Sequence, residues 1–156
     1  MSTDDKNGLD AYDLSSQIGF RLRLAMQRHT EIFFNTMELG LTQAQYASLA
    51  QLYRVGSCSQ NQLGRSVALD SASIAGVVNR LKRNGLVTSM RDEVDRRRMT
   101  ISLTDKGRAL VEQAIPLALD ANETTLSMLD EAERVMLVHL LRKLACDEGD
   151  KRKPEE

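Results

Sequence analysis

Basic side chains gather in one short segment of an otherwise balanced chain. Between residues 80 and 98 there are seven Lys or Arg residues and three acidic residues, a local surplus of four, whereas the chain of 156 residues has a formal net charge of −1. Clustered Lys and Arg residues bind the phosphates of nucleic acids. The near-neutral total excludes a generally basic nucleic-acid coat protein. The segment therefore predicts a local nucleic-acid-binding surface.

The residues at the start of this segment have the pattern of a helix that fits the major groove of DNA. Apolar side chains recur on one side of a helical wheel, at Ile74, Val77, Val78 and Leu81. The opposite side is small and polar, so the backbone can approach base edges. Asn79 suits adenine, and the arginines suit guanine or phosphate. The predicted DNA contacts on this helix are Ser71, Ser73, Gly76, Asn79, Arg80 and Arg83.

Gly76 bears on the alternative interpretation, an ordinary amphipathic surface helix. A glycine within a helix costs about 1 kcal/mol relative to alanine. A surface helix has no need of that cost, whereas a helix that docks into a groove gains close approach from it. The glycine therefore favours DNA contact over a plain surface role.

A strongly charged turn between two short strands follows this helix. Arg96 and Arg97 lie at its tip, where they can enter a narrow minor groove, whose negative potential attracts arginine. Asp95 is expected to hold a neighbouring arginine in orientation, and Arg91 to support the wing from the strand. A solvated charged turn is the alternative for the tip alone. The order helix, turn, helix, strand, charged tip and strand, from about Ser59 to Thr104, predicts a winged helix-turn-helix.

Helices on both sides must position this unit, and their ends carry recognisable signals. The predicted elements are a helix over Asp10–Met37, a helix over Thr42–Arg54, a short helix after Ser59 with Gln62 completing a capping box, a helix from Asp70 that stops at Asn84-Gly85, strands at Val87–Arg91 and Met99–Leu103, a helix begun by Thr104, and a helix over Glu131–Ala145. Pro116 is expected to kink or break the helix that Thr104 begins. The fold class predicted is mainly α with a small β-hairpin wing.

The first predicted helix is apolar on more than one face. Phe20, Leu24 and Phe34 lie off its main apolar stripe. A helix with more than one apolar face is buried on more than one side. This indicates that a second subunit covers the extra face.

Composition narrows the remaining function classes. The chain is 42% hydrophobic and 28% charged, which is typical of a helical globular protein. The apolar runs are short, and the acidic, polar N-terminus does not resemble a signal peptide, so a soluble cytoplasmic protein without membrane contact is expected. The sequence shows no Ser-His-Asp pattern, phosphate loop or metal-spaced Cys/His cluster, so neither an enzyme nor a metal or other cofactor is expected.

The sequence resembles the MarR family of bacterial transcription regulators. The resemblance rests on "ALDSASIAGVVNRLKRNGLVTSMRDEVDRRRMTISLTDKGRAL", residues 68–110, with Asp95 and Arg97 at the Asp-x-Arg positions of the family's wing. Its "LTDKG" run is equally typical, and the flanking helices match the family layout over nearly the whole chain. One departure is Glu93, where a proline is common, which makes the local shape of the wing less certain.

This resemblance implies an obligate homodimer in which helices from both ends of the chain interlock. The two recognition helices would read a pseudo-palindromic operator, with Arg97 in the minor groove. Most members are repressors that a small phenolic or aromatic carboxylate releases from DNA, through a pocket between the dimerisation helices and the DNA-binding lobe. The expected organisation is a helical dimerisation region at residues 10–40 and 117–146, a winged helix-turn-helix at 41–116, and flexible tails at 1–9 and 147–156.

A pocket for an aromatic acid needs apolar walls and a cationic or hydrogen-bond-donating group. His29 lies at the centre of the first helix's apolar stripe, with Met26 nearby and Arg21 at its margin, while Tyr46 and Tyr53 could supply hydroxyls from the next helix. A core or dimer-interface histidine is the equal alternative for His29, and a salt-bridge partner is the alternative for Arg21. The run "FRLRLAMQRH" is similar to regulators of nicotinate breakdown. It suggests nicotinic acid or a hydroxynicotinic acid as the effector.

Cys58 supports a second hypothesis, a thiol-based oxidant-sensing repressor. It lies next to the N-cap of a helix, and a helix N-terminus can lower the pKa of a thiol. Oxidant-sensing members of the family usually carry their cysteine near the start of the first helix, where this chain has none. The ligand-responsive repressor is therefore the favoured reading.

Overall fold

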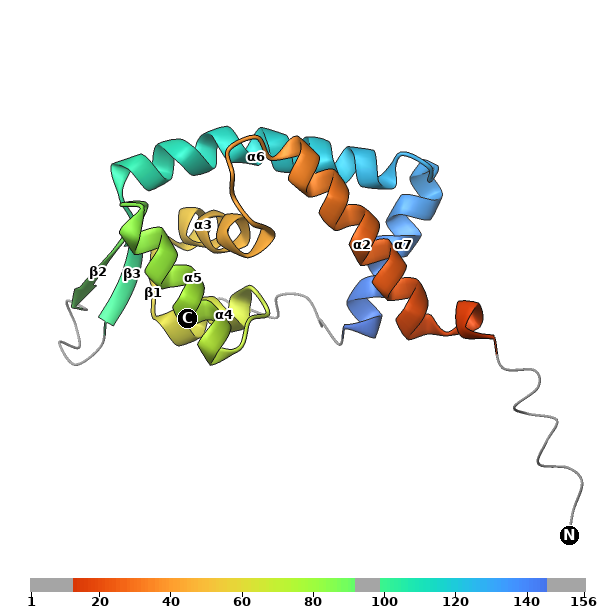
Figure 1. Ribbon diagram of the computed structural model, residues 1–156, viewed down its shortest axis with the longest axis horizontal. Helices are drawn as coiled ribbons and strands as arrows, with labels where there is room; N and C mark the ends of the chain where they lie inside the picture. The colour runs from red at the N-terminus through yellow and green to blue at the C-terminus, as the bar shows by residue number, and fades with distance from the viewer. Residues whose placement is uncertain (1–12, 92–98, 146–156) are drawn as a thin grey trace, which may run out of the picture.

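The computed structural model describes residues 13–91 and 99–145 (Figure 1). Its elements in chain order are the short 3₁₀ helix η1 (Leu14–Ser16), α2 (Ile18–Thr36), α3 (Gln43–Val55), β1 (Ser57–Cys58), α4 (Gln60–Ser66), α5 (Ser71–Arg83), β2 (Val87–Arg91), β3 (Met99–Leu103), α6 (Asp105–Leu126) and α7 (Glu131–Leu144). The mainly helical class with a small β wing is confirmed. The expected tails and the wing-tip residues Asp95, Arg96 and Arg97 lie outside the described residues.

The helices of the DNA-binding lobe begin where local capping chemistry predicts. Ser59 caps α4: its hydroxyl accepts from the Gln62 backbone N–H, and Gln62 Oε1 accepts from the Ser59 backbone N–H, which confirms the predicted capping box. Asp70 caps α5, and Thr104 caps α6. After α5 the chain turns at Gly85, whose φ of +70° suits glycine. These ends fix the register of the helix-turn-helix relative to the wing.

The first helix is shorter than predicted. In place of a continuous helix over Asp10–Met37, η1 is followed by extended backbone at Gln17, and α2 begins only at Ile18. The Asp13 carboxylate accepts a hydrogen bond from the backbone N–H of Ser15 at 2.9 Å. This local bond favours a short capped turn over continuation of the helix.

Helix α6 continues through Pro116, so the expected break does not occur. Pro116 is exposed, and so is Glu112, the residue whose carbonyl loses its helical hydrogen bond to position 116. On the opposite side Ala114 and Ala118 are buried and hold the helix against its neighbours. Packing on one face therefore keeps α6 continuous across the proline.

The wing is a three-stranded antiparallel sheet in the order β1-β3-β2. Strands β2 and β3 have the predicted bounds, and their register pairs Val87 with Leu103 and Arg91 with Met99. Strand β1, which pairs Cys58 with Ile101, was not predicted because two residues are too few to show alternation.

Two buried clusters form the core, and α6 contributes to both. The first lies within the helix-turn-helix lobe and comprises Leu49, Leu52, Leu63, Ile74, Val78, Leu81, Leu86, Val87, Ile101 and Val111. The second lies where α2 crosses α6 and comprises Phe33, Met37, Ala114, Ala118 and Ala121. Figure 1 shows α6 spanning the molecule above α3 and meeting α2. One helix thus connects the wing end of the protein with the α2 end.

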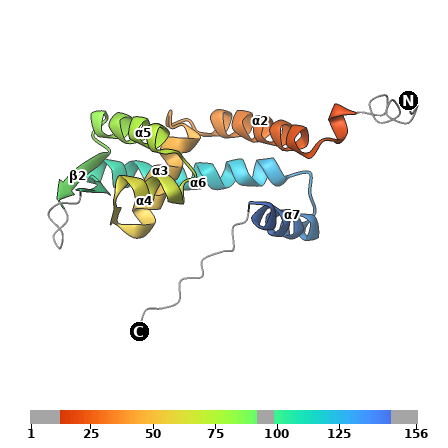
Figure 2. The ribbon, with the colours of Figure 1, turned by 90° about the horizontal axis from the view of Figure 1, so that it is seen from below.

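Helix α7 lies at the opposite end from the wing, and none of its residues is buried (Figure 2). Its exposed apolar side chains include Val135, Met136 and Leu144, and α2 exposes Phe34 at 79%. A soluble monomer rarely leaves so much apolar surface open. Within the described residues, no helix is long and apolar enough to span a membrane.

Candidate DNA interface and ligand pocket

Helix α5 separates its residues as the sequence predicts. Ile74, Val78 and Leu81 are buried in the core of the lobe, and Val77 is half-buried. The predicted contacts on the other side, Ser71, Ser73, Asn79, Arg80 and Arg83, are all exposed, and Gly76 is partly so. The structure therefore brings these residues together on one outward face, which we call the α5 face. Of the predicted wing residues, Arg91 is described, and it is exposed at the end of β2.

Gly76 has no structural reason to be a glycine within the described residues. A Cβ at this position would meet no atom within 4 Å beyond its chain neighbours and the nearby backbone of its own helix, and its φ is not positive. By contrast, a Cβ on Gly64 in α4 would lie 3.1 Å from the Ile74 side chain. Gly64 thus allows α4 and α5 to approach each other, whereas Gly76 leaves room on the outer surface. This open space is what close approach of another molecule requires.

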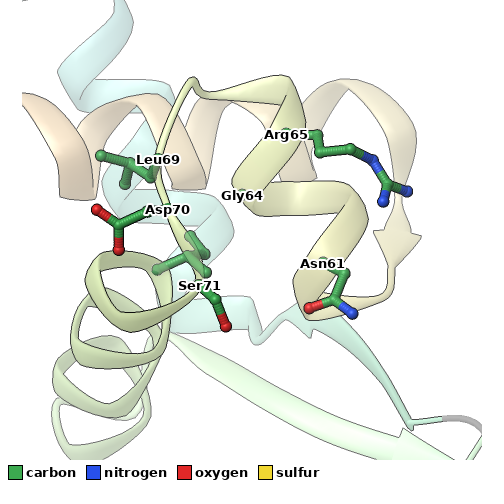
Figure 3. A pocket seen from close by; sticks show the side chains of 7 residues that line it. Asn61, Gly64, Arg65, Leu69, Asp70 and Ser71 are labelled. Atoms are coloured by element: carbon green, nitrogen blue, oxygen red, sulfur yellow. The ribbon is translucent and has the colours of Figure 1, made fainter.

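The turn between α4 and α5 forms a polar hollow next to the α5 face (Figure 3). It is lined by Asn61, Gly64, Arg65, Leu69, Asp70, Ser71 and Ile74. The Asp70 carboxylate is occupied by the cap, because it accepts hydrogen bonds from the Ser73 backbone N–H at 2.8 Å and the Ser73 hydroxyl at 3.0 Å. These bonds lower the pKa of Asp70. Asn61, Arg65 and Ser71 remain as exposed donors at the rim of the hollow.

The start of α6 is bonded to the turn that ends α5. The Thr104 backbone N–H donates to the Leu86 carbonyl at 3.1 Å, and the Thr104 hydroxyl donates to the Gly85 carbonyl at 2.6 Å. The Lys106 ammonium donates to the Asn84 carbonyl at 2.9 Å. Three successive carbonyls directly after α5, the recognition helix, therefore accept hydrogen bonds from the start of α6, so the two helices are joined at this point.

A pocket of about 330 Å³ lies between α2, α3 and α6. It adjoins the second half of α6, whereas the turn after α5 is bonded to the start of that helix. Its lining residues are Met26, His29, Phe33, Gln43, Tyr46, Ala118 and Asn122. The Phe33 ring centroid lies 6.3 Å from that of His29 and 5.9 Å from that of Tyr46. Partial burial raises the pKa of Tyr46, so its hydroxyl stays protonated at neutral pH. The pocket thus combines aromatic walls with hydrogen-bonding groups.

Thr125 fixes the orientation of His29. The Thr125 hydroxyl donates to the Ala121 carbonyl at 2.7 Å and lies 2.9 Å from His29 Nδ1. Because the only proton of that hydroxyl is used, Nδ1 must be the donor in the contact with Thr125. Neutral His29 therefore carries its proton on Nδ1 and has Nε2 as an acceptor.

The structure brings together only part of the predicted effector set. Met26, His29 and Tyr46 line the pocket, but Arg21 and Tyr53 do not. The Tyr53 hydroxyl donates to Glu112 at 3.1 Å, and the Arg108 guanidinium lies 5.3 Å from the centre of the Tyr53 ring, so this tyrosine joins α3 to the first half of α6. Arg21 is exposed at the start of α2.

Gln43 and Asn122 line the pocket and were missed by sequence reasoning. Gln43 follows a capping residue and Asn122 lies in the second half of a long helix, positions at which polar residues are ordinary. No local pattern distinguishes them, because the pocket forms only when α2 and α3 pack against α6. The two carboxamides add donors and acceptors to the aromatic walls.

Cys58 has an environment opposite to that of a reactive thiol. It is half-buried on β1, and this burial raises its pKa, whereas the sequence suggested that the nearby N-terminus of α4 could lower it. A higher pKa leaves less of the nucleophilic thiolate at neutral pH. The structure gives no support to oxidant sensing through this residue.

A helix-turn-helix joined to a small antiparallel wing, with a polar outward face on its second helix, defines a winged-helix DNA-binding protein. The chain belongs to the MarR family of transcription regulators, whose model matches residues 41–99. The sequence is 40% identical over 134 residues, 85% of each chain, to the HTH-type transcriptional repressor NicR of Pseudomonas putida KT2440.

Two solved structures of relatives share this fold. BpsR of Bordetella bronchiseptica, whose DNA binding is regulated by 6-hydroxynicotinic acid, is 41% identical with a TM-score of 0.83, over 89% of this chain and 99% of BpsR. PcaV of Streptomyces coelicolor, solved with its natural ligand, is 31% identical with a TM-score of 0.81, over 90% of this chain and 99% of PcaV.

These similarities confirm the predicted family and favour its nicotinate-type branch. The chain is accordingly a DNA-binding transcription regulator, and it exposes apolar residues on α2 and α7.

Proposed function

We propose that the protein is a repressor that leaves its operator when a small aromatic acid binds between α2, α3 and α6. The observation that carries this proposal is the aromatic-walled pocket around His29, Phe33 and Tyr46, joined by one continuous helix to the end of the recognition helix. The similarity of the chain to NicR, BpsR and PcaV supports the same proposal. The proposed activity of the protein consists of binding and release of DNA, without catalysis.

The α5 face enters the major groove in this proposal. Asn79 contacts adenine, and Arg80 and Arg83 contact guanine or phosphate. Ser71 and Ser73 contact the sugar-phosphate backbone of the DNA. Gly76 allows the helix to approach the bases closely. Asn61 and Arg65, at the rim of the hollow in Figure 3, add contacts to the phosphates beside the groove. The wing-tip residues Arg96 and Arg97 are proposed for the minor groove from sequence alone, with Asp95 holding a neighbouring arginine in orientation.

Two copies of this lobe read a pseudo-palindromic site when the helical regions at residues 10–40 and 117–146 pair. The lobe at residues 41–116 has to be held at a fixed separation from its partner, because the two recognition helices must meet successive major grooves on one side of the duplex. The unburied apolar residues of α7 favour this role for the C-terminal region. Repression follows if the operator overlaps a promoter.

The effector is a one-ring aromatic acid, with 6-hydroxynicotinic acid the first candidate because it regulates BpsR. A pocket of about 330 Å³ lies near the lower end of the range for small-ligand sites, roughly 300–1,000 Å³. The rings of Phe33 and Tyr46 suit a flat ligand. His29, Gln43 and Asn122 supply polar contacts, with Met26 as an adjustable apolar wall.

The DNA part of the proposal is tested by operator binding. Fluorescence anisotropy with a duplex from the protein's own upstream region should show that Arg83→Ala weakens binding at least tenfold at physiological salt. Arg54→Ala, which removes an exposed arginine of α3 outside the α5 face, is the control and should bind as the unmodified protein does. Equal affinity of Arg83→Ala and the control would refute the placement of α5 in the groove.

The effector part is tested in the same assay. Addition of 6-hydroxynicotinic acid should release the unmodified protein from the duplex, while His29→Phe should bind DNA normally but resist release. Normal release of His29→Phe would place the effector elsewhere. No release of the unmodified protein by any of a set of aromatic acids would refute effector control through this pocket.

A further inference from the structure

The side chain of Gln43, in the wall of the pocket, is incompletely hydrogen-bonded by the described residues. Its Nε2 atom is buried and has no hydrogen-bond partner among the described residues. Of the buried side-chain nitrogen and oxygen atoms in residues 13–91 and 99–145, it is the one without a partner. A buried donor without a partner costs free energy, and such exceptions in a folded protein call for an explanation. A bound molecule that completes its hydrogen bonding is the explanation that its place in the pocket wall suggests.

The backbone beneath Gln43 is held in place by its neighbours. Thr42 caps α3, its hydroxyl accepts from the Gln45 backbone N–H at 3.2 Å, and Gln45 Oε1 accepts from the Thr42 backbone N–H at 3.0 Å. Gln45 is buried, and its Oε1 atom is engaged in the cap. Gln43 lies between these two residues on the same rigid turn, yet no hydrogen bond to a described residue holds its amide. The chain therefore presents this carboxamide to the pocket from a fixed position.

The polar groups around the pocket can accept hydrogen bonds as well as donate them. Neutral His29 has Nε2 as an acceptor, because Nδ1 donates to Thr125. The carboxamides of Gln43 and Asn122 each carry an acceptor oxygen and an N–H₂ donor. A carboxylate can only accept hydrogen bonds, so it pairs with the donors of the pocket and leaves the acceptors unused. A ring that carries a donor beside an acceptor pairs with both the acceptors and the donors.

We propose that Gln43 is a specificity-determining residue that reads the ring of the effector rather than its carboxylate. The inferred ligand class is an aromatic acid whose ring presents a donor next to an acceptor, as a hydroxylated nitrogen heterocycle does in its cyclic-amide form. Such an edge pairs with a carboxamide through two parallel hydrogen bonds. The inference rests on the proposed function, because it takes the pocket as the effector site, and it goes further in assigning discrimination to one side chain.

The test compares two ligands that differ only at the ring edge. Calorimetric titration with 6-hydroxynicotinic acid and with nicotinic acid should show that the unmodified protein prefers the hydroxylated acid at least tenfold, because a site built for hydrogen bonding rejects an analogue that lacks the bonding group. Gln43→Met keeps the length of the side chain and removes both amide groups. It should lower the preference to within about twofold, mainly by weakening the hydroxylated acid. Gln113→Met, an exposed glutamine of α6, is the control and should keep the preference.

A second readout separates this role from a structural one. Without ligand, Gln43→Met should unfold at the same or a higher temperature than the unmodified protein, because the unpartnered amide is gone. A lower midpoint with an unchanged ligand preference would show that Gln43 serves the fold, and would overturn the inference. An unchanged preference at an unchanged midpoint would overturn it too. Binding of neither acid to the unmodified protein would instead refute the proposed effector site itself.

Discussion

Gly107 lies against the backbone of Leu86, so closely that a Cβ on residue 107 would overlap the Leu86 carbonyl oxygen. The same carbonyl accepts the Thr104 backbone N–H at 3.1 Å. The first turn of α6 and the chain that leaves the recognition helix therefore touch backbone to backbone. Movement of α6 at this end cannot occur without movement of the turn after α5. In the proposed function, this contact links α6, which lines the pocket, to the chain that leaves the α5 face.

Gly107→Ala should destabilise the protein strongly. The obstructing atoms are backbone, which cannot rotate away as a side chain can, so α6 would have to separate from the wing. We expect a loss of about 3 kcal/mol in the free energy of unfolding, at the upper end of overpacking effects. Urea denaturation followed by circular dichroism measures it. A loss below about 1 kcal/mol would show that this contact is looser than the structure indicates.

Gly76→Ala should have opposite effects on stability and on DNA binding. A Cβ at residue 76 meets no atom within 4 Å, so the free energy of unfolding should rise by about 1 kcal/mol, the ordinary gain of alanine over glycine in a helix. Operator affinity should fall, because the added methyl group occupies the space that the α5 face leaves for bases. Higher stability with unchanged affinity would place Gly76 outside the interface.

Ala68→Gly should stabilise the helix-turn-helix. Ala68, between α4 and α5, has a φ of +55°, a left-handed conformation that strains a residue with a Cβ. Relief of that strain, less the entropy that glycine loses on folding, gives an expected gain of about 0.5–1 kcal/mol. Thermal unfolding of the variant beside the unmodified protein checks it. A lower midpoint would mean that the alanine methyl group makes contacts that outweigh the strain.

Asp70 should contribute a pH-dependent part of the stability. Its pKa is lowered by the hydrogen bonds from the Ser73 backbone N–H and hydroxyl, so the carboxylate stabilises the fold at pH values above the ordinary aspartate pKa, about 3.9. That contribution is lost as the pH falls through the lower value of the folded state. Asp70→Asn should therefore reduce the fall in melting temperature between pH 5 and strongly acidic conditions, roughly the range over which such carboxylates lose their stabilising charge.

The matched control is Asp120→Asn, which changes an exposed aspartate in the middle of α6. It should melt with the same pH dependence as the unmodified protein. If Asp70→Asn does so as well, the capping bonds of α5 are not formed in solution.

Local chemistry made the DNA-binding lobe predictable from sequence. Asp70, Thr104 and Gly85 mark the ends of their elements through interactions within a few residues, and these signals survive in any tertiary context. The side of α5 that faces outward followed from the helical period alone. The same reasoning allowed a kink or a break at Pro116, and the break does not occur, because buried alanines on the opposite side hold α6 against its neighbours.

The pocket could be predicted only in part, because it is made by segments far apart in the chain. His29 and Tyr46 were found through their aromatic character on apolar stripes, but Gln43 and Asn122 carry no such signal. Arg21 and Tyr53 have suitable chemistry yet lie elsewhere, because the crossing of α2 over α6 decides which residues meet. Periodicity specifies which face of a helix is buried, and it does not specify what that face meets.

The most direct test of the account is the thermodynamic coupling between the two sites. Coupling between ligands is reciprocal, so if 6-hydroxynicotinic acid weakens operator binding by some factor, saturating operator must weaken 6-hydroxynicotinic acid binding by the same factor, typically about 5–150-fold. Titration calorimetry of the acid into the free protein and into the protein–operator complex measures this directly. We predict weaker binding to the complex by the factor seen in DNA release. Equal affinity of the acid for the free and the DNA-bound protein would contradict the account.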